Sequence, residues 1–246
     1  MSHLTGKIAL VTGGSRGIGA AIARRLGADG ADVAITYSVS SGRAQEVVRD
    51  IRALGREALA IRADNLEAEA VERAITLTVE HFGRLDILVN NAGIYHAGPV
   101  EQFTYEDFEK TVAINVRAPF LASKVAASHM GEGGRIVSIG SNLALRVPDQ
   151  GLSLYSLSKA ALVGMTKGMA RDLGSRGITV NVVHPGSTNT EMNPANGPGA
   201  DAQRAGMAIP GFSDPNDIAS IVAWLASPEA SRVTGAEFTV DGGSNA

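Results

Sequence analysis

The sequence predicts an α/β fold in which helices cover both faces of one doubly wound parallel β-sheet. Short apolar runs alternate with helix-like segments along the chain, which is typical of strands joined by crossover helices. The apolar runs are continuous rather than alternating, as expected for strands that are buried on both faces. Glycines end several of these segments, among them Gly13, Gly30 and Gly55.

The expected strands and helices follow one another in a regular order. Strands are predicted at 7–12, 32–38, 57–64, 85–93, 134–141 and 177–186. Helices are predicted between the first four of these strands, at 18–30, 42–55 and 67–83. Such connections are right-handed, so the strands should form a Rossmann-type sheet. We expect residues 1–246 to form a single domain, because one hydrophobic core can serve this length.

Composition narrows the possible functions. The chain has no cysteine, which excludes disulfides, thiolate metal sites and a cysteine nucleophile. A formal net charge of −3 gives no electrostatic reason to expect a nucleic acid polymer or a membrane as partner. No signal peptide, no long apolar span and no histidine–glutamate metal motif is evident. We therefore expect a cytoplasmic protein without a bound metal.

A glycine-rich turn, TGGSRGIG (12–19), lies between the first strand and the first helix. Gly13, Gly17 and Gly19 would let the backbone turn sharply and approach a pyrophosphate closely. The helix that starts there would offer free N–H groups to the phosphates. The spacing differs from the commonest dinucleotide fingerprint, and tight helix–strand packing is an alternative reason for these glycines. The flanking strand and helix favour a dinucleotide site.

The end of the second strand indicates which dinucleotide is bound. An NAD site usually has a carboxylate there to bind the ribose 2′-hydroxyl. Here the strand ends at Tyr37 and Ser38, and Asp32 lies at its other end. Arg16 could pair with a 2′-phosphate, helped by a hydrogen bond from Ser38 and by Arg43. The sequence therefore predicts NADP(H), with a merely solvated Arg16 as the alternative.

Five motifs occur along the chain in this order: TGGSRGIG (12–19), NNAG (90–93), SIGS (138–141), YSLSK (155–159) and HPG (184–186). Together they resemble the short-chain dehydrogenase/reductase family, and the resemblance extends from Lys7 to Gly243. Within the family, the chain resembles the branch of 3-oxoacyl-[acyl-carrier-protein] reductases and of bacterial carbonyl and quinone reductases. The loop NPANGP (193–198) and the surrounding C-terminal third resemble a subgroup of cyclic-di-GMP-binding biofilm-dispersal proteins.

Tyr155 and Lys159 are four residues apart and so share one face of a helix. A nearby ammonium stabilises a phenolate, so we expect Lys159 to lower the pKa of Tyr155. Tyr155 would donate its proton to a carbonyl oxygen as hydride reaches the carbon, or run the reverse. A surface packing pair is the alternative for such spacing when it occurs alone.

The resemblance implies further roles for individual residues. Lys159 would also bind the nicotinamide ribose, Ser141 would hold the substrate oxygen, and Asn115 would hold a water that connects Lys159 to solvent. Ser138 is expected within the strand instead. A Ser-His-Asp hydrolase is an alternative for Ser141, but no G-x-S-x-G elbow surrounds it, and His184 is expected to be an ordinary turn histidine.

The resemblance also implies where the cofactor lies along the sheet. Asp64 and Asn65 would contact adenine, and Thr188 and Thr190 would meet the nicotinamide carboxamide. The expected cofactor-binding residues are Gly13, Ser15, Arg16, Gly17, Ile18, Gly19, Tyr37, Ser38, Asp64, Asn65, Asn90, Ala92, Gly93, Tyr155, Lys159, Pro185, Gly186, Thr188 and Thr190.

The substrate is expected to be a small carbonyl, ketone or quinone compound. Residues 190–212 are rich in Gly, Pro and Asn and would form a lid over it, with a passive surface loop as the alternative. The lining is predicted to consist of apolar and aromatic side chains, namely Tyr95, His96, Leu143, Leu145, Val147 and Met192. The stretch 128–136 lacks the basic cluster that an acidic carrier protein would need, which speaks against a 3-oxoacyl thioester.

Two functions follow from these residues and motifs. The first is an NADPH-dependent oxidoreductase that uses Asn115, Ser141, Tyr155 and Lys159. The second is a nucleotide-binding regulatory protein of the cyclic-di-GMP-binding type on the same fold. The resemblance further implies a homotetramer or homodimer.

Overall fold

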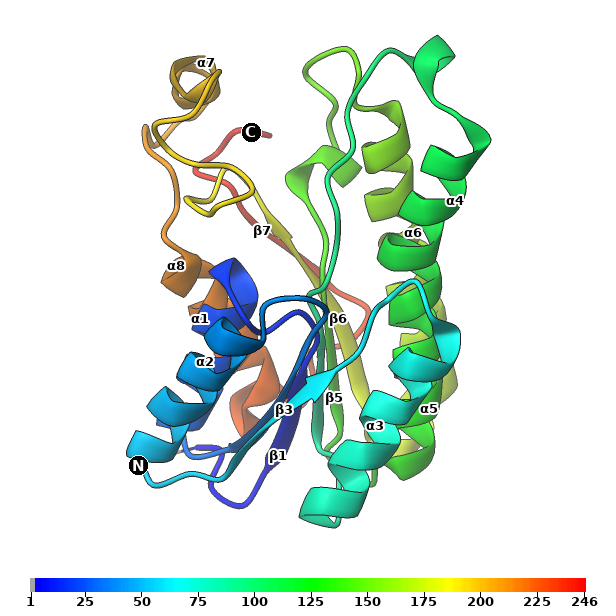
Figure 1. The fold of residues 1–246 in the computed structure, drawn as a ribbon, viewed down its shortest axis with the longest axis vertical. Helices are drawn as coiled ribbons and strands as arrows, with labels where there is room; N and C mark the ends of the chain where they lie inside the picture. The colour runs from blue at the N-terminus through cyan, green and yellow to red at the C-terminus, as the bar shows by residue number, and fades with distance from the viewer. Residues whose placement is uncertain (1–2) are drawn as a thin grey trace.

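The computed structural model describes residues 3–246 and confirms the predicted fold class (Figure 1). Seven strands form one sheet in the order β3-β2-β1-β4-β5-β6-β7, and every neighbouring pair is parallel. In chain order they are β1 (Ile8–Val11), β2 (Asp32–Tyr37), β3 (Ala58–Arg62), β4 (Ile87–Asn90), β5 (Arg135–Ile139), β6 (Thr179–Pro185) and β7 (Glu237–Val240). The strand order reverses between β1 and β4, and ligands of such sheets bind outside the carboxyl ends of the strands at that point.

Helices cover both faces of the sheet, as Figure 1 shows. They are α1 (Gly17–Ala28), α2 (Ser41–Ala53), α3 (Ala68–Phe82), α4 (Tyr105–Val112), α5 (Ala118–His129), α6 (Ser153–Leu173), α7 (Ala200–Ala205) and α8 (Pro215–Ala226). The core on one face contains residues of α1, α2 and α8, and the core on the other face contains residues of α3, α5 and α6. None of the helices within residues 3–246 combines the length and the hydropathy that crossing a membrane requires.

The two cores hold the sheet between the helices. Ile35 of β2 packs with Leu26 of α1 on one face, and Leu88 of β4 packs with Ile75 of α3 on the other. All four side chains are fully buried. Burying such a side chain stabilises the fold by about 1.5–3 kcal/mol, so these contacts fix the strands that carry the site.

The structure differs from the expected elements at the ends of the strands. β4 ends at Asn90 and β5 ends at Ile139, so the last residues of the predicted strands 85–93 and 134–141 are loops. These residues lie at the carboxyl edge of the sheet, where the motifs cluster. β7 is an additional strand that pairs with β6, and its partly exposed residues lack the continuous apolar run by which the other strands are recognised.

Candidate functional site

The carboxyl ends of β1 and β4 are joined by two side chains that the sequence analysis did not single out. The Thr12 hydroxyl accepts hydrogen bonds from the backbone N–H groups of Asn91 (2.9 Å) and Ala92 (3.1 Å). The Asn91 amide in turn donates to the carbonyls of Thr12 (2.9 Å) and Gly13 (3.2 Å). Both residues flank or belong to the quoted motifs, which is the signal that could have identified them.

The glycines of the turn serve two different purposes. Gly13 and Gly17 have φ values of +64° and +53°, which disfavour any side chain. A Cβ on Gly19 would lie 2.4 Å from both Asn91 Nδ2 and the Gly13 carbonyl oxygen. A Cβ on Gly14 would lie 2.7 Å from Ile35, so this fourth glycine allows the turn to pack closely on β2. Backbone conformation therefore accounts for Gly13 and Gly17, and close packing for Gly14 and Gly19.

Arg16 and Arg43 converge on one carboxylate. Arg16 Nη1 lies 2.9 Å from Oε2 of Glu191, and Arg43 Nη1 contacts Oε1 of the same side chain. Hydrogen bonds from Arg43 and Arg16 lower the pKa of Glu191. The two predicted phosphate-binding arginines, Arg16 just before α1 and Arg43 in α2, thus lie close enough to share one anionic group. Glu191 belongs to the segment 190–212 and was not predicted as a site residue.

A cavity of about 360 Å³ lies at the end of β2. Its lining consists of Tyr37, Ser38, Val39, Ser41 and Arg62. Arg62 Nε donates to the Ser38 carbonyl at 3.4 Å, which adds a cation that the sequence analysis missed. A second cavity, about 540 Å³, is lined by residues of β3 and α3 and contains none of the predicted site residues.

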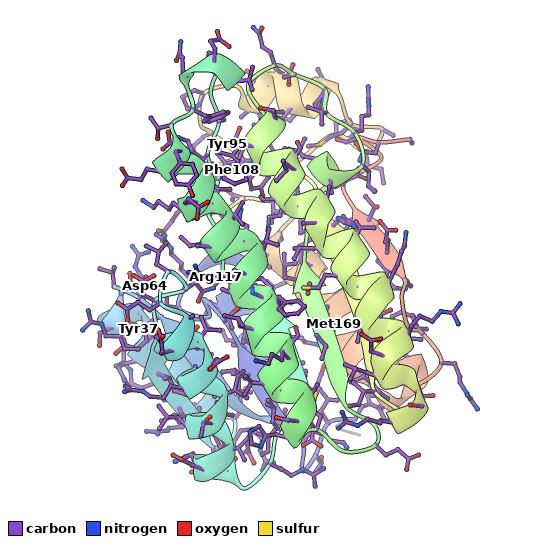
Figure 2. All side chains as sticks on the ribbon, turned by 90° about the vertical axis from the view of Figure 1, so that its right-hand side faces the viewer. Tyr37, Asp64, Tyr95, Phe108, Arg117 and Met169 are labelled. Atoms are coloured by element: carbon purple, nitrogen blue, oxygen red, sulfur yellow. The ribbon has the colours of Figure 1, made fainter. Side chains whose placement is uncertain are left out.

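The other predicted adenosine contacts follow β3 and β4. Figure 2 shows Asp64 next to Tyr37, and Asp64 Oδ1 accepts a hydrogen bond from the Leu66 N–H at 3.0 Å. Asn90 differs, because its side chain is buried and donates to the hydroxyls of Ser123 (2.9 Å) and Ser138 (3.4 Å). Its side chain therefore faces the core, and only its backbone is left for a ligand. Ser15, Ile18, Asn65, Ala92 and Gly93 are partly buried at the same edge.

Ser141, Tyr155 and Lys159 lie together at the carboxyl end of β5. Ser141 is the second residue after β5, while Tyr155 and Lys159 belong to the first two turns of α6. Lys159 is buried, donates from Nζ to the Ile139 carbonyl at 2.9 Å and lies 5.8 Å from the centre of the Tyr155 ring. The structure therefore brings together the three residues expected to transfer a proton.

The electrostatics of this cluster differ from the expectation. Burial raises the pKa of Tyr155 to about 12, and hydrogen bonding with Ser141 only partly opposes it. The expected lowering of the Tyr155 pKa is therefore not observed, because burial of the phenol dominates. Burial also lowers the pKa of Lys159 to about 8. At neutral pH, Tyr155 is thus protonated and Lys159 is mostly charged.

Asn115 lies in a π-helical turn (Ala113–Arg117) between α4 and α5. Its amide exchanges two 2.9 Å hydrogen bonds with the backbone of Ile94 and donates to the Ser158 hydroxyl at 3.0 Å. A Cβ on Gly93 would lie 3.2 Å from Asn115 Oδ1 and 3.4 Å from Lys159 Nζ. Asn115 therefore connects the loop after β4 with α6 and lies beside the lysine.

The chain after β6 reaches back to the glycine-rich turn. Pro185 ends β6, and a Cβ on Gly186 would lie 2.5 Å from Asp241 Cβ, so this turn is tightly packed. The Thr188 hydroxyl donates to the Gly186 carbonyl at 3.1 Å. The Thr190 methyl group is 3.5 Å from the position a Cβ would take on Gly17. Thr190 thus lies against the start of α1.

The predicted substrate lining is only partly assembled as expected. The Tyr95 and Tyr155 rings meet edge to face at 5.0 Å, and Tyr95, Leu145, Val147 and Met192 are about half exposed. Figure 2 shows Tyr95 at the same end of the molecule as Phe108 of α4. His96 was expected to join this lining, but its ring instead packs on Phe103 at 5.3 Å and lies 3.6 Å from an Asp107 oxygen.

The C-terminal residues connect two loops around the cluster. The Ile209 N–H donates to the Gly242 carbonyl at 2.8 Å, which fixes the end of the segment 190–212. Arg146 donates to the Ser244 carbonyl at 2.5 Å, and the Asn245 amide donates to the Asn142 carbonyl at 2.8 Å. The tail therefore contacts both the loop after Ser141 and the predicted lid.

Comparison with known proteins gives consistent matches over the whole chain. A family model described as enoyl-(acyl carrier protein) reductase matches residues 13–245. The chain is 46% identical to the cyclic-di-GMP-binding biofilm dispersal mediator protein of Escherichia coli (strain K12), with 98% of each chain covered. It is 42% identical to hydroxynaphthalene reductase arp2 of Aspergillus fumigatus, with 96% of this chain and 91% of the relative covered.

A solved structure gives a similar result. A short chain dehydrogenase from Burkholderia cenocepacia J2315, crystallised in complex with NADP, superposes with a TM-score of 0.98. It shares 61% sequence identity with this chain, and the match covers 99% of this chain and 100% of that one.

Gly19→Ala tests the packing of the turn. The added methyl would overlap Asn91 Nδ2 and the Gly13 carbonyl, so we expect a loss of about 1–3 kcal/mol in the free energy of unfolding and weaker NADP binding. Gly164→Ala in α6 is the matched control, since a Cβ added there would have no atom of a packing neighbour within 4 Å among the described residues. Urea denaturation and NADP titration measure both effects. Equal stability of the two variants would contradict the packing argument.

Lys159→Met tests the burial of the lysine. Between pH 8 and 10.5 the unfolded chain holds a proton at Lys159 that the folded chain has lost, so this residue makes stability rise with pH across that window. We expect the rise, measured by urea denaturation at about pH 7 and about pH 10, to be smaller in Lys159→Met. Lys124→Met, at an exposed lysine of α5, should keep the wild-type slope. If the free energy of unfolding of Lys159→Met rose with pH as steeply as that of the wild type, the lysine would be solvated in the folded protein.

Proposed function

The chain belongs to the short-chain dehydrogenase/reductase family, and from this membership we propose that it transfers hydride between NADPH and a carbonyl, ketone or quinone substrate, with Tyr155 as general acid and base. The observation that carries the proposal is the cluster of buried Ser141 and Lys159 with the partly buried Tyr155, in which the phenol keeps its proton at neutral pH. A protonated phenol is the form that donates to a substrate oxygen during reduction.

Each member of the cluster has a distinct role in this reaction. NADPH, when bound, supplies the hydride. The Ser141 hydroxyl would donate a hydrogen bond to the substrate oxygen, and Tyr155 would transfer its proton to that oxygen. The Lys159 ammonium would stabilise the phenolate that remains, since it lies 5.8 Å from the ring centre in a site of low dielectric. Asn115 would hold the loop after β4 and helix α6 together beside the lysine.

The preference for NADP(H) rests on the paired arginines. Arg16 and Arg43 share one carboxylate of the chain, so they can also share the 2′-phosphate of a dinucleotide. The NADP complex of the Burkholderia protein, which is 61% identical, supports this assignment. Glu191 would have to leave the arginines when the phosphate binds, because the two anions would otherwise repel each other.

Residues 190–212 fit the role of a substrate lid. The segment begins beside Gly17, contains the short helix α7 and ends at the bond from Ile209 to Gly242. Its ion pairs with Arg16 and Arg43 cross from the region after β6 to α1 and α2, so cofactor binding and lid position are coupled. The half-exposed side chains of Tyr95, Leu145, Val147 and Met192 offer an apolar wall that suits a ketone or quinone of modest size.

A second candidate function is favoured by one observation, the 46% identity to the cyclic-di-GMP-binding protein of Escherichia coli. Arg16, Arg43 and Arg62 are cations near the end of β2 that suit a phosphodiester as well as a 2′-phosphate.

The exposed aromatic side chains of Phe108 and Phe120 on α4 and α5 support self-association into a homodimer or homotetramer, which we propose for either function.

Tyr155→Phe tests the proposed chemistry. Loss of the proton donor should lower kcat by roughly 10²- to 10⁴-fold, because general acid catalysis contributes on that scale. NADPH affinity should change little, and NADPH oxidation against a panel of quinones, diketones and aromatic ketones measures the rate. Wild-type turnover that survives in Tyr155→Phe would contradict the mechanism. Wild type that binds NADPH and cyclic-di-GMP without any turnover would support the second candidate.

The arginine pair is tested through cofactor preference. Arg16→Ala should weaken NADPH binding roughly tenfold and leave NADH binding unchanged, because one charge-assisted hydrogen bond to the 2′-phosphate is lost. Glu191→Gln should tighten NADPH binding several-fold, because it frees both arginines. Asp201→Asn is the control, since this carboxylate of α7 pairs with Arg204 instead. Equal effects of Arg16→Ala on NADPH and NADH would remove the argument for NADP(H).

A further inference from the structure

His184 is a buried imidazole that the proposed reaction does not use. It lies near the end of β6, has no exposed surface and packs beneath Ser141. Its Nδ1 lies 2.9 Å from the Ser141 carbonyl oxygen and 3.3 Å from the Ser141 backbone nitrogen. The ring also excludes any side chain at position 140, because a Cβ on Gly140 would lie 2.5 Å from Nδ1. The imidazole therefore touches the backbone on which the predicted substrate-binding serine stands.

The other ring nitrogen faces an ion pair. Nε2 lies 3.4 Å from Oε2 of Glu237 in β7. This contact does not have the geometry of a hydrogen bond, and Nε2 has no hydrogen-bond partner among residues 3–246. Oε1 of Glu237 is 2.7 Å from Lys167 Nζ on α6, and this lysine is 58% exposed. A continuous set of contacts thus runs from a surface lysine through Glu237 and His184 to Ser141.

The Glu237 carboxylate bears on which hydrogen bond His184 makes. Nδ1 cannot accept from the Ser141 N–H and donate to the Ser141 carbonyl at once, so the tautomer decides between them. The shorter contact, 2.9 Å to the carbonyl oxygen, favours a proton on Nδ1, whereas a carboxylate beside Nε2 favours a proton on Nε2 and leaves Nδ1 as the acceptor. The carboxylate carries a full negative charge and the carbonyl only a partial one, which favours the second arrangement. The charged groups that face the ring are Glu237 from β7 and Lys159 from α6, and burial lowers the pKa of His184, so the ring is neutral.

We propose that His184 is a positioning residue for Ser141 and that Glu237, held by Lys167, sets the tautomer in which it acts. The proposal deepens the proposed oxidoreductase function and rests on it. In this arrangement the Ser141 N–H is fixed by Nδ1, and the Ser141 hydroxyl, which accepts from the Leu143 N–H at 3.2 Å, keeps its orientation toward Tyr155. If His184 only filled space in the core, a change of its tautomer would leave the rate of the reaction unchanged.

Glu237→Gln separates these two roles without removing the ring. We expect kcat to fall roughly tenfold, which equals about 1.4 kcal/mol of transition-state stabilisation, while KM for NADPH stays the same. Lys167→Met should have a smaller effect in the same direction. Glu72→Gln is the matched control, because Glu72 pairs with Lys124 on the surface at 4.0 Å and neither residue contacts the site. An unchanged kcat in Glu237→Gln would overturn the proposal.

Nitrogen-15 NMR of the histidine ring gives a readout that needs no substrate. In wild type the His184 signals should show a protonated Nε2, and in Glu237→Gln they should move toward the other tautomer. His184→Asn, whose amide can still reach the Ser141 backbone, identifies the signals and should retain more activity than His184→Leu. A protonated Nδ1 in wild type would overturn the inference even if the enzyme is active. Wild type without Tyr155-dependent turnover would instead reject the proposed function, whatever the tautomer.

Discussion

The Thr12 hydroxyl holds together the two strands between which the sheet reverses direction. The backbone hydrogen bonds between β1 and β4 end at this point. The Thr12 hydroxyl accepts from the N–H groups of Asn91 and Ala92, which would otherwise lack a partner there. The glycine-rich turn is built on this junction, since the Asn91 amide holds the carbonyl of Gly13 and leaves no space at Gly19. The positions of the glycine-rich turn and of the loop after β4 therefore depend on it.

Desolvation shifts the pKa values of the predicted proton-transfer residues. The same burial acts in opposite directions on an acid and a base, because it disfavours whichever form is charged. It keeps the phenol of Tyr155 protonated and brings the ammonium of Lys159 close to neutrality near pH 8. At neutral pH the phenol therefore holds its proton, while a rise of about one pH unit is enough to remove much of the charge of the lysine beside it.

The sequence alone predicted the parts of this structure that depend on local pattern. Continuous apolar runs identified six strands, and the motifs identified the residues that the parallel strands bring to one edge. The partners that come from distant segments were missed, such as Glu191, which is 175 residues from Arg16. β7 was missed because its residues are only partly buried. The direction of the Tyr155 pKa was wrong because a motif shows which groups are adjacent but not how deeply they are buried.

The bonds of the C-terminal tail make it a mechanical link between two loops. Gly242 holds the far end of the segment 190–212, and Ser244 and Asn245 hold the loop that follows Ser141. A hinge motion of one loop therefore has to stretch these bonds or pull the other loop with it. Any step that requires one of these loops to open therefore has to break the tail hydrogen bonds or move both loops together.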